Sequence, residues 1–258
     1  MISARWREAI EELLRRKLRT LLTLLGMIFG VGAIVAMQGV GEGSRREALK
    51  LVDSLGLHNL IVEAKSQNGD ALKETRARSL GLTVADARAA LDVVPSAEHY
   101  AAEKRVKRWG IFSDSGHADA EVSGISPEYF QLASLHVAEG RALNASDNAS
   151  LAAVAVLGHQ VAHDLFPDGK PLGRLFKVNQ VWLRVVGVLA DRDLGQDKFE
   201  GVALGADSNR VFVPLASARA RFRFQPMENE VDRFLLRLED PEGLSIGARV
   251  LTELLNQR

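Results

Sequence analysis

The sequence predicts an α+β protein with one N-terminal transmembrane helix and a folded domain outside the membrane. Three observations predict this class. Residues 20–41 contain no charged side chain. The rest of the chain mixes short strand-like runs with isolated helices, as in α+β rather than doubly wound proteins. With 258 residues and a 47% hydrophobic composition, the chain is long and apolar enough to bury a core.

Composition and charge exclude several kinds of function. The chain has no cysteine, which excludes disulfides, thiolate nucleophiles and cysteine-ligated zinc or iron–sulfur sites. The formal net charge is zero, which argues against a protein that coats nucleic acid, so we expect no nucleic-acid partner. The charge is nevertheless uneven, because residues 1–19 hold six basic and three acidic side chains.

The uncharged segment Thr20–Gly41 predicts a membrane-spanning helix. At about 1.5 Å per residue its 22 residues extend about 33 Å, enough to cross a hydrocarbon core. Four basic residues lie between positions 15 and 19, so the positive-inside rule predicts a cytoplasmic N-terminus. Residues 42–258 would then lie outside a bacterial inner membrane, in the periplasm or extracellular space. The two alternatives are a cleavable signal peptide, whose apolar region is shorter, and a buried soluble helix, which rarely runs this long uncharged.

Two features adjoin or lie within this span. Gly26 and Gly30 form a Gly-x-x-x-Gly pair, a spacing that lets a second membrane helix approach closely. Residues 1–19 predict a cytoplasmic amphipathic helix, because Trp6, Ile10 and Leu14 recur at helical spacing. Its apolar face suits either the lipid interface or a cytoplasmic partner, and the sequence does not choose between them.

The first half of the external region predicts alternating strands and helices. Leu60–Glu63 is a short strand. Thr83 with Asp86 predicts a capped helix that Pro95 ends. Strands are expected over 100–107 and 109–112. Ser126 followed by Pro127 predicts a helix start, with Ser126 as the cap.

The second half continues the same mixture. Residues 152–157 predict a strand, and 158–166 a short helix closed by the turn Pro167-Asp168-Gly169. A hairpin is expected across Asn179-Gln180. Residues 190–209 lack periodicity and predict a long loop. The remaining expected elements are strands 175–178, 181–189, 211–213 and 234–238 and helices 217–222 and 244–255.

Candidate chemistry in the sequence is sparse. His159 and His163 have the spacing of a metal-binding pair, but no glutamate stands between them as in metalloproteases and no third ligand is evident. Three acidic residues around Gly116 lack the spacing of a calcium loop. The glycines at 39, 41 and 43 lack the Lys-Ser/Thr of a phosphate loop. Asn144 and Asn148 fit a glycosylation pattern and indicate an exposed loop. We therefore predict no catalytic, cofactor-binding or metal-binding residue.

Several long segments carry a resemblance to one family. They are KLRTLLTLLGMIFGVGAIVAMQGVGEGSR, SLGLHNLIVEA, GISPEYFQLASLHVAEGRAL, VAVLGHQVAHDLFPDGKPLGRLFKVN, VWLRVVGVLAD and VFVPLASARARF. In order and spacing they resemble the MacB-like permeases of the mechanotransmission class of ABC transporters. Residues 64–80 and 96–120 match more loosely.

The resemblance implies a periplasmic core domain over 42–258. It implies a proximal part, at about 42–110 and 210–258, with a second part of about 111–209 inserted between them. It also implies a non-catalytic role, in which a cytoplasmic ABC ATPase hydrolyses ATP and a homo- or heterodimer of permeases carries the motion across the membrane. A periplasmic adaptor would be a further partner, and the outcome would be efflux or lipoprotein release.

One departure from the family pattern concerns length. Family permeases have three more membrane helices and a cytoplasmic coupling helix after the core domain, whereas this sequence ends at Arg258. We therefore expect a truncated permease, or a fragment of one. The alternative from another functional class is a membrane-anchored periplasmic sensor or enzyme. An enzyme would need convergent acids, bases or ligands, and a sensor would need a cytoplasmic output domain larger than 19 residues.

Overall fold

Two units make up the chain, residues 1–53 and 54–258. The computed structural model describes residues 17–54, 59–65, 70–76, 79–191, 198–199, 202–203, 206–239 and 244–256. The amphipathic helix expected over residues 1–19 lies almost wholly outside these ranges.

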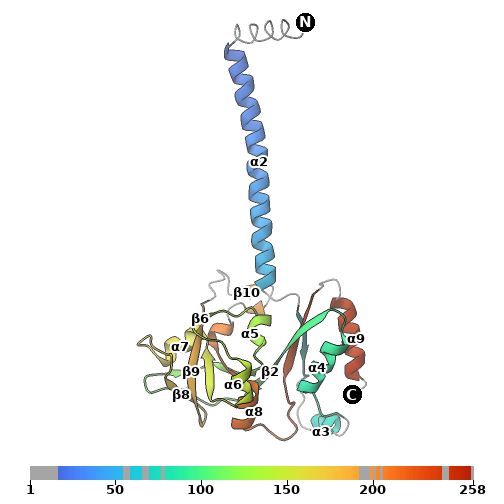
Figure 1. Cartoon of the computed structure of the whole chain (residues 1–258), viewed down its shortest axis with the longest axis vertical. Coiled ribbons are helices and arrows are strands. Elements are labelled where there is room, and N and C mark those ends of the chain that lie inside the picture. The colour runs from blue at the N-terminus through green and yellow to red at the C-terminus, as the bar shows by residue number, and fades with distance from the viewer. Residues whose placement is uncertain are drawn as a thin grey trace. The chain divides into compact units, whose positions relative to one another are not determined.

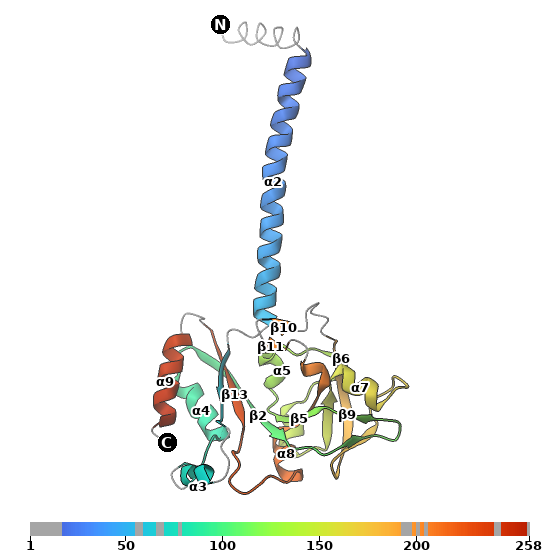
Figure 2. The same ribbon diagram turned by 180° about the vertical axis from the view of Figure 1, so that it is seen from behind.

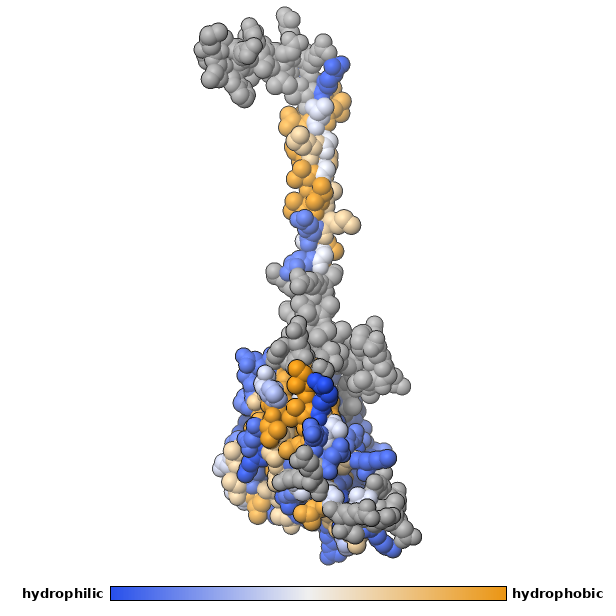
Figure 3. Space-filling view, turned by 90° about the vertical axis from the view of Figure 1, so that its right-hand side faces the viewer, coloured by the Kyte–Doolittle hydropathy of each residue, from blue (hydrophilic) through white to orange (hydrophobic). Residues whose placement is uncertain are grey.

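The described part of the first unit is one long helix, α2 (Lys17–Ser54), with 38 residues, the last of which is counted in the second unit. Its apolar stretch Lys17–Gly43 has a mean hydropathy of 2.2 and none of it is buried. Apolar residues cover most of this stretch in Figure 3. By length and composition it can cross a membrane. The helix therefore covers the expected Thr20–Gly41 span and continues beyond it on both sides.

The second unit is built on one curled, mixed sheet of 11 strands (Figures 1 and 2). The strands run in the order β1-β13-β2-β5-β12-β7-β9-β8-β3-β4, and β6 pairs with β9. Most neighbours are antiparallel, but β12 runs parallel to β5 and β7 runs parallel to β9. The strands are β1 (Asn59–Glu63), β2 (Ala97–Val106), β3 (Ile111–Phe112), β4 (His117–Ala118), β5 (Glu121–Ile125), β6 (Val137–Gly140), β7 (Val154–Leu157), β8 (Leu175–Val178), β9 (Val181–Leu189), β12 (Arg210–Pro214) and β13 (Arg233–Leu238).

Helices cover both faces of this sheet. The pair α4 (Val84–Val93) and α9 (Leu244–Asn256) lie side by side and form one apolar core with β1, β2 and β13. On the other face, α5 (Tyr129–Leu132) packs with β2, β12 and β13. The helices α7 (His159–Leu165) and α8 (Leu215–Arg221) close a third core over β5, β7, β8, β9 and β12. The other α-helices described in this unit are α3 (Asp70–Arg76) and α6 (Ala145–Ala149).

The structure confirms several elements that local sequence signals predict. Thr83 caps α4, and its side chain and that of Asp86 form the reciprocal hydrogen bonds of a capping box. The hairpin β8–β9 has the expected bounds, and Asn179 in its turn adopts a positive φ of 54°, which asparagine tolerates better than most residues. The helix expected over 158–166 is α7, flanked by Gly158 and Phe166.

Three expectations are wrong in detail. Ser126 does not cap α5, because its hydroxyl accepts a hydrogen bond from the N–H of Ala102 in β2 at 3.1 Å. The expected loop at Asn144 contains α6, because Asn144 and Asp147 form a second capping box. The expected loop 190–209 contains a two-stranded sheet of β10 (Lys198–Phe199) and β11 (Val202–Ala203) and the 3₁₀ helix η1 (Ala206–Asn209). Its other residues, apart from Ala190 and Asp191, lie outside the described ranges.

A buried ionic network joins four adjacent strands of the sheet. Glu103 of β2 is fully buried. One of its carboxylate oxygens accepts hydrogen bonds from Arg210 of β12 and, at 2.8 Å, from Ser123 of β5. The other oxygen accepts from Arg233 of β13 at 2.5 Å. Arg233 also donates to the hydroxyl of Tyr129 in α5 at 2.7 Å, so α5 is tied to the same network.

The pKa values in this network follow from its charges. Burial alone would raise the pKa of Glu103, but the charges of Arg210 and Arg233 outweigh burial and hold it below its ordinary value of 4.5. Burial raises the pKa of Tyr129, and the negative charge of Glu103 adds to that shift. The network therefore holds an ionised Glu103 and a neutral Tyr129 at neutral pH.

The first prediction concerns autonomous folding of the external domain. A fragment of residues 42–258 should be soluble and should unfold in one cooperative thermal transition. The reason is that residues 54–258 form a separate unit with its own apolar cores. Circular dichroism during heating would measure this. A melt without a cooperative transition would contradict the prediction.

The second prediction concerns Glu103. Replacing Glu103 with Gln should lower the free energy of unfolding by about 3–5 kcal/mol, because two arginines would lose their buried counter-charge. The matched control is Glu98→Gln, at an exposed position of the same strand, where we expect a change within about 0.5 kcal/mol. Equal stability of the two variants in denaturant titrations would contradict the prediction.

The stability provided by Glu103 should also depend on pH in one direction. Since its pKa is lower in the folded than in the unfolded chain, its contribution is complete above pH 4.5 and is lost as the pH falls through the lowered value. The difference between the parent protein and Glu103→Gln should therefore narrow below pH 4.5. A difference that stays constant down to pH 3 would rule out this linkage.

Candidate functional site

A groove of about 960 Å³ lies at the β1 end of the sheet. Five segments and Leu255 line it: the end of β1 with the next two residues, α3, the residues around the start of α4, the end of β2, and the segment Gln225–Asp232. We call this surface the groove. Because the segments come from both ends of the domain sequence, the groove exists only once β13 has paired with β1 and β2.

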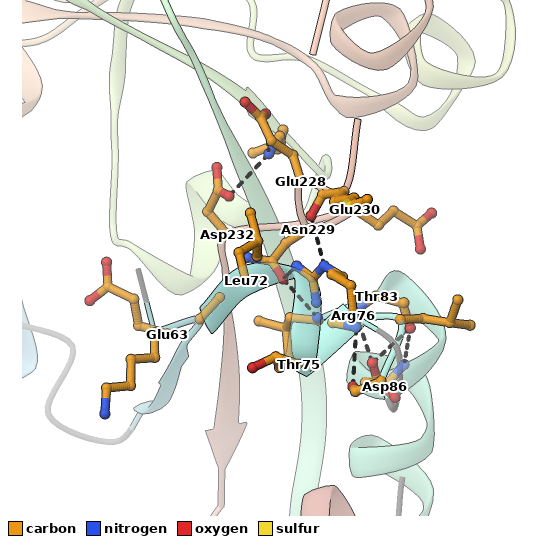
Figure 4. A pocket seen from close by; sticks show the side chains of 18 of the residues that line it. Glu63, Leu72, Thr75, Arg76, Thr83, Asp86, Glu228, Asn229, Glu230 and Asp232 are labelled. Carbon is orange, nitrogen blue, oxygen red and sulfur yellow. Dashed lines mark hydrogen bonds and ion pairs between the residues drawn. The ribbon is translucent and has the colours of Figure 1, made fainter. Parts of the chain in front are cut away.

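Arg76 fixes one wall of the groove. Its guanidinium donates to the carbonyl of Met227 at 2.7 Å and to the side-chain oxygen of Asn229 at 2.6 Å. The same Asn229 oxygen accepts from the N–H of Leu82 at 3.2 Å. Figure 4 shows Arg76 and Asn229 turned toward one another. Gly81 has a φ of +80°, and a Cβ there would lie 2.1 Å from Arg76 Nη1. Glycine at position 81 therefore allows the guanidinium to lie against the backbone.

Lys104 neutralises the opposite wall. Its buried ammonium lies 3.1 Å from Asp232 and 3.3 Å from Glu228, and 4.9 Å from the centre of the Phe224 ring. Burial would raise the pKa of Glu228, but the charge of Lys104 outweighs it and lowers that pKa. Glu103 points to the other side of β2, because neighbouring side chains alternate along a strand. The groove wall and the buried network thus share one strand.

The other carboxylates of the groove are also engaged. Glu63 lies 2.8 Å from Arg105. Glu230 forms an ion pair with Arg219 at 2.5 Å and accepts from the N–H of Val84 at 3.1 Å. Among the described residues, no group of three or more histidine or acidic side chains could hold a metal ion. Carboxylates held by basic side chains thus line the groove together with apolar side chains such as Val62, Leu72 and Leu82.

The residues singled out in the sequence are separated in space or lack ligand geometry. Nothing lies within 4 Å of a Cβ built on Gly26 or Gly30, so both positions leave room for a second helix, and packing there stays a prediction. The glycines at 39, 41 and 43 lie inside α2, which is the wrong geometry for a phosphate loop. His159 and His163 are exposed on α7.

The three acidic residues considered for a cation loop each lie beside a different arginine. Asp114 pairs with Arg174 at 2.6 Å, and Asp119 pairs with Arg108. Glu121 lies in strand β5 with its carboxylate 3.8 Å from Arg210. These carboxylates therefore serve three different ion pairs.

Sequence reasoning missed the charged residues that organise the sheet. Glu103, Arg210 and Arg233 lie in strands, where a charged residue normally faces solvent. The only signal is that each lies directly beside a short continuous run of apolar residues, as in Arg210–Pro214, where every position is buried. That pattern predicts a buried strand but does not pair an arginine with a glutamate more than 100 positions away.

Comparison with known proteins agrees with this architecture. Residues 20–249 match the family model described as the MacB-like periplasmic core domain. The chain is 28% identical over 252 residues to the macrolide export ATP-binding/permease protein MacB 1/2 of Paracoccus denitrificans, covering 98% of this chain and 36% of that protein. It is 29% identical over 258 residues to the pyoverdine export ATP-binding/permease protein PvdT of Pseudomonas aeruginosa, covering 92% of this chain and 37% of that protein. The chain thus spans about a third of the length of these relatives.

Solved structures share the fold. The periplasmic region of MacB from Actinobacillus actinomycetemcomitans aligns with a TM-score of 0.61 at 18% identity, covering 80% of this chain and 86% of that one. The extracellular domain of the transporter YknZ from Gram-positive bacteria aligns with a TM-score of 0.58 at 20% identity, covering 77% and 94%. The family model covers the candidate membrane helix and nearly all of the sheet domain in one match. The chain therefore belongs to the MacB-like periplasmic core domain family of ABC transporter permeases.

Proposed function

We propose that the chain is the non-catalytic permease component of a mechanotransmission ABC transporter. The observation that carries the proposal is that one family match runs from the apolar helix through the folded domain, over residues 20–249. A cytoplasmic ABC ATPase supplies the energy in this proposal. The domain outside the membrane uses it to drive substrate export or the release of lipoproteins.

The mechanics of the domain support this role. The network around Glu103 fastens β13, β2, β5 and β12, which are consecutive strands of the sheet. A sheet tied in this way moves as a body rather than shearing between strands. Such a domain suits the transfer of motion from one partner to another. The engaged carboxylates of the groove favour partner or ligand binding over acid–base catalysis.

We propose a cytoplasmic N-terminus and a bacterial inner-membrane location. The support is the cluster of basic residues before the apolar stretch and the composition of α2. Residues 42–258 then lie in the periplasm or outside the cell. Two relatives are named as macrolide and pyoverdine export proteins, and we propose export of a small molecule as the first role to test.

We also propose the division of the domain into two parts. The apolar core under α4 and α9 draws its buried residues from 82–102 and 215–251, which fall in the proximal part of about 42–110 and 210–258. The core under α7 and α8 draws most of its buried residues from 106–188, close to the inserted part of about 111–209. The second core also uses residues 211–222, so the two parts would share strand β12 and helix α8.

The proposed partners are the ATPase, a second permease copy or relative, and a periplasmic adaptor. Dimerisation through α2 is supported by the Gly-x-x-x-Gly spacing of Gly26 and Gly30. The adaptor would bind the domain outside the membrane.

The third prediction concerns orientation. Alkaline phosphatase fused after Arg258 should be active, and a reporter that works only in the cytoplasm should be inactive at the same position. The basic residues before α2 are the reason. Activity of the cytoplasmic reporter alone would refute the proposed orientation and the location of the domain.

The fourth prediction concerns ATP. The purified full chain in detergent should hydrolyse no ATP above the rate of a mock purification, because the sequence has no Gly-x-x-x-x-Gly-Lys-Ser/Thr motif. Phosphate release with Mg²⁺ and ATP is the measurement. Turnover that persists in step with the protein through further purification would overturn the non-catalytic role.

The fifth prediction concerns packing of α2. Replacing Gly26 and Gly30 with Leu should weaken self-association of the helix in a membrane two-hybrid assay by about tenfold, since bulky side chains would separate the backbones. Gly32→Leu is the matched control, because residue 32 lies about 200° around the helix from Gly30. Equal effects of the three substitutions would show that this face has no special role.

A further inference from the structure

An exposed row of side chains crosses the sheet at the end opposite β1. His117, Phe112, Lys177 and Trp182 lie directly opposite one another on β4, β3, β8 and β9. Beside them, Leu175 and Arg184 form the next cross-strand pair. We call these six residues the aromatic row. In Figure 1, β8 and β9 lie on the far side of the domain from α9.

All six side chains point to the same face of the sheet, because directly opposite residues share a face and residues two apart along a strand do so too. The intervening residues, such as Phe176 and Leu183, are buried in the core beneath. Strands are about 4.8 Å apart, so a row across four strands is about 14 Å long. That length matches about two turns of a helix or a short extended segment.

The composition of this face is unusual for a solvated sheet. A sheet with one face on the core normally presents polar residues on the other. Here Phe112 is 54% exposed, Trp182 is 56% exposed and Leu175 is 50% exposed. Large aromatic side chains left in water at the centre of a patch mark interfaces more often than bare surface.

The charge of the row has one sign. Lys177 lies with its ammonium 5.8 Å from the centre of the Trp182 ring. Within the described ranges neither Lys177 nor Arg184 has an ion pair with a carboxylate. The nearby carboxylates of Asp114 and Asp168 are both held by Arg174, at 2.6 Å each. The row thus combines exposed aromatic rings with two cations that lack a counter-charge.

We propose that the aromatic row binds an acidic segment of a partner protein, one whose carboxylates alternate with aliphatic or aromatic side chains. Its carboxylates would supply the counter-charges that Lys177 and Arg184 lack, and its apolar side chains would cover Phe112 and Trp182. An anionic membrane is disfavoured as the occupant, since binding of that kind draws on clusters of four to eight basic residues. The proposal goes beyond the transport role and does not depend on it.

The test uses the full chain in phosphatidylcholine nanodiscs and three fluorescein-labelled peptides of 12 residues. They alternate leucine with glutamate, glutamine or lysine. Fluorescence anisotropy should show binding of the glutamate peptide at least tenfold tighter than of the other two. Trp182→Ala should weaken that binding by tenfold or more. The double variant Lys177→Glu/Arg184→Glu should abolish it and should instead bind the lysine peptide.

Two control variants match these changes at the other end of the domain. Arg249→Glu and Ile246→Ala replace exposed residues of α9 and should leave binding within twofold of the parent. Thermal melting of each variant should match the parent, because every substituted side chain lies at the surface.

Several results would overturn the proposal. They are failure of the glutamate peptide to bind at 1 mM, equal binding of all three peptides, and unchanged binding after the charge reversal. Binding to phosphatidylglycerol vesicles with no peptide preference would assign the row to a lipid surface instead. Self-association in sedimentation velocity that Trp182→Ala removes would assign it to a second copy of this chain.

Discussion

The fold of the domain depends on one fully buried carboxylate. Glu103 sits where β2 passes between β13 and β5, and its charge is balanced by arginines from β13 and β12. An isolated charge there would be too costly to bury, so the four strands must be in register before Glu103 can leave water. The ion pairs of Glu103 therefore constrain how the four strands pair more than they add to the net stability of the fold. They select the register in which residues over 100 positions apart meet.

The groove follows from the same constraint. Along β2, Glu103 faces the buried network, while its neighbour Lys104 faces the groove and holds Glu228 and Asp232. On β13, Arg233 faces the network, and Asp232 immediately before it faces the groove. Since side chains alternate between the two faces of both strands, the single register of β2 with β13 forms the ion pairs of the network on one face and those of the groove on the other. A slip of β2 by one residue would turn Glu103 toward the groove and Lys104 toward the buried network.

Sequence reasoning reached the elements whose causes are local. The capping box at Thr83, the turn at Asn179 and the uncharged span of α2 each depend on residues a few positions apart. It failed where a side chain forms its hydrogen bond with a residue that is distant in sequence. Ser126 is of a residue type that often caps helices, but its hydroxyl accepts a hydrogen bond from the N–H of Ala102 in strand β2. The glycosylation pattern at Asn144 predicts an exposed loop, whereas Asp147, three residues on, completes a capping box with Asn144 at the start of α6. The groove was not predictable because its segments are distant in sequence. Within the aromatic row, the β8–β9 hairpin is local, but its pairing with β3 is not.

The groove and the aromatic row lie at opposite ends of the sheet order. The groove is formed at β1, the first strand in the sheet order, and the aromatic row crosses the last four strands of the order. Between β1 and β9 stand β13, β2, β5 and β12, which the Glu103 network joins, and β7, which pairs with β12 and β9. Under the proposed function, a partner bound at one end would displace the other end, since close-packed protein interiors transmit strain. Under the proposed function, this rigidity rather than any reactive group is what the domain contributes. Weakening Glu103 would then reduce coupling between partners even in a domain that still binds each of them.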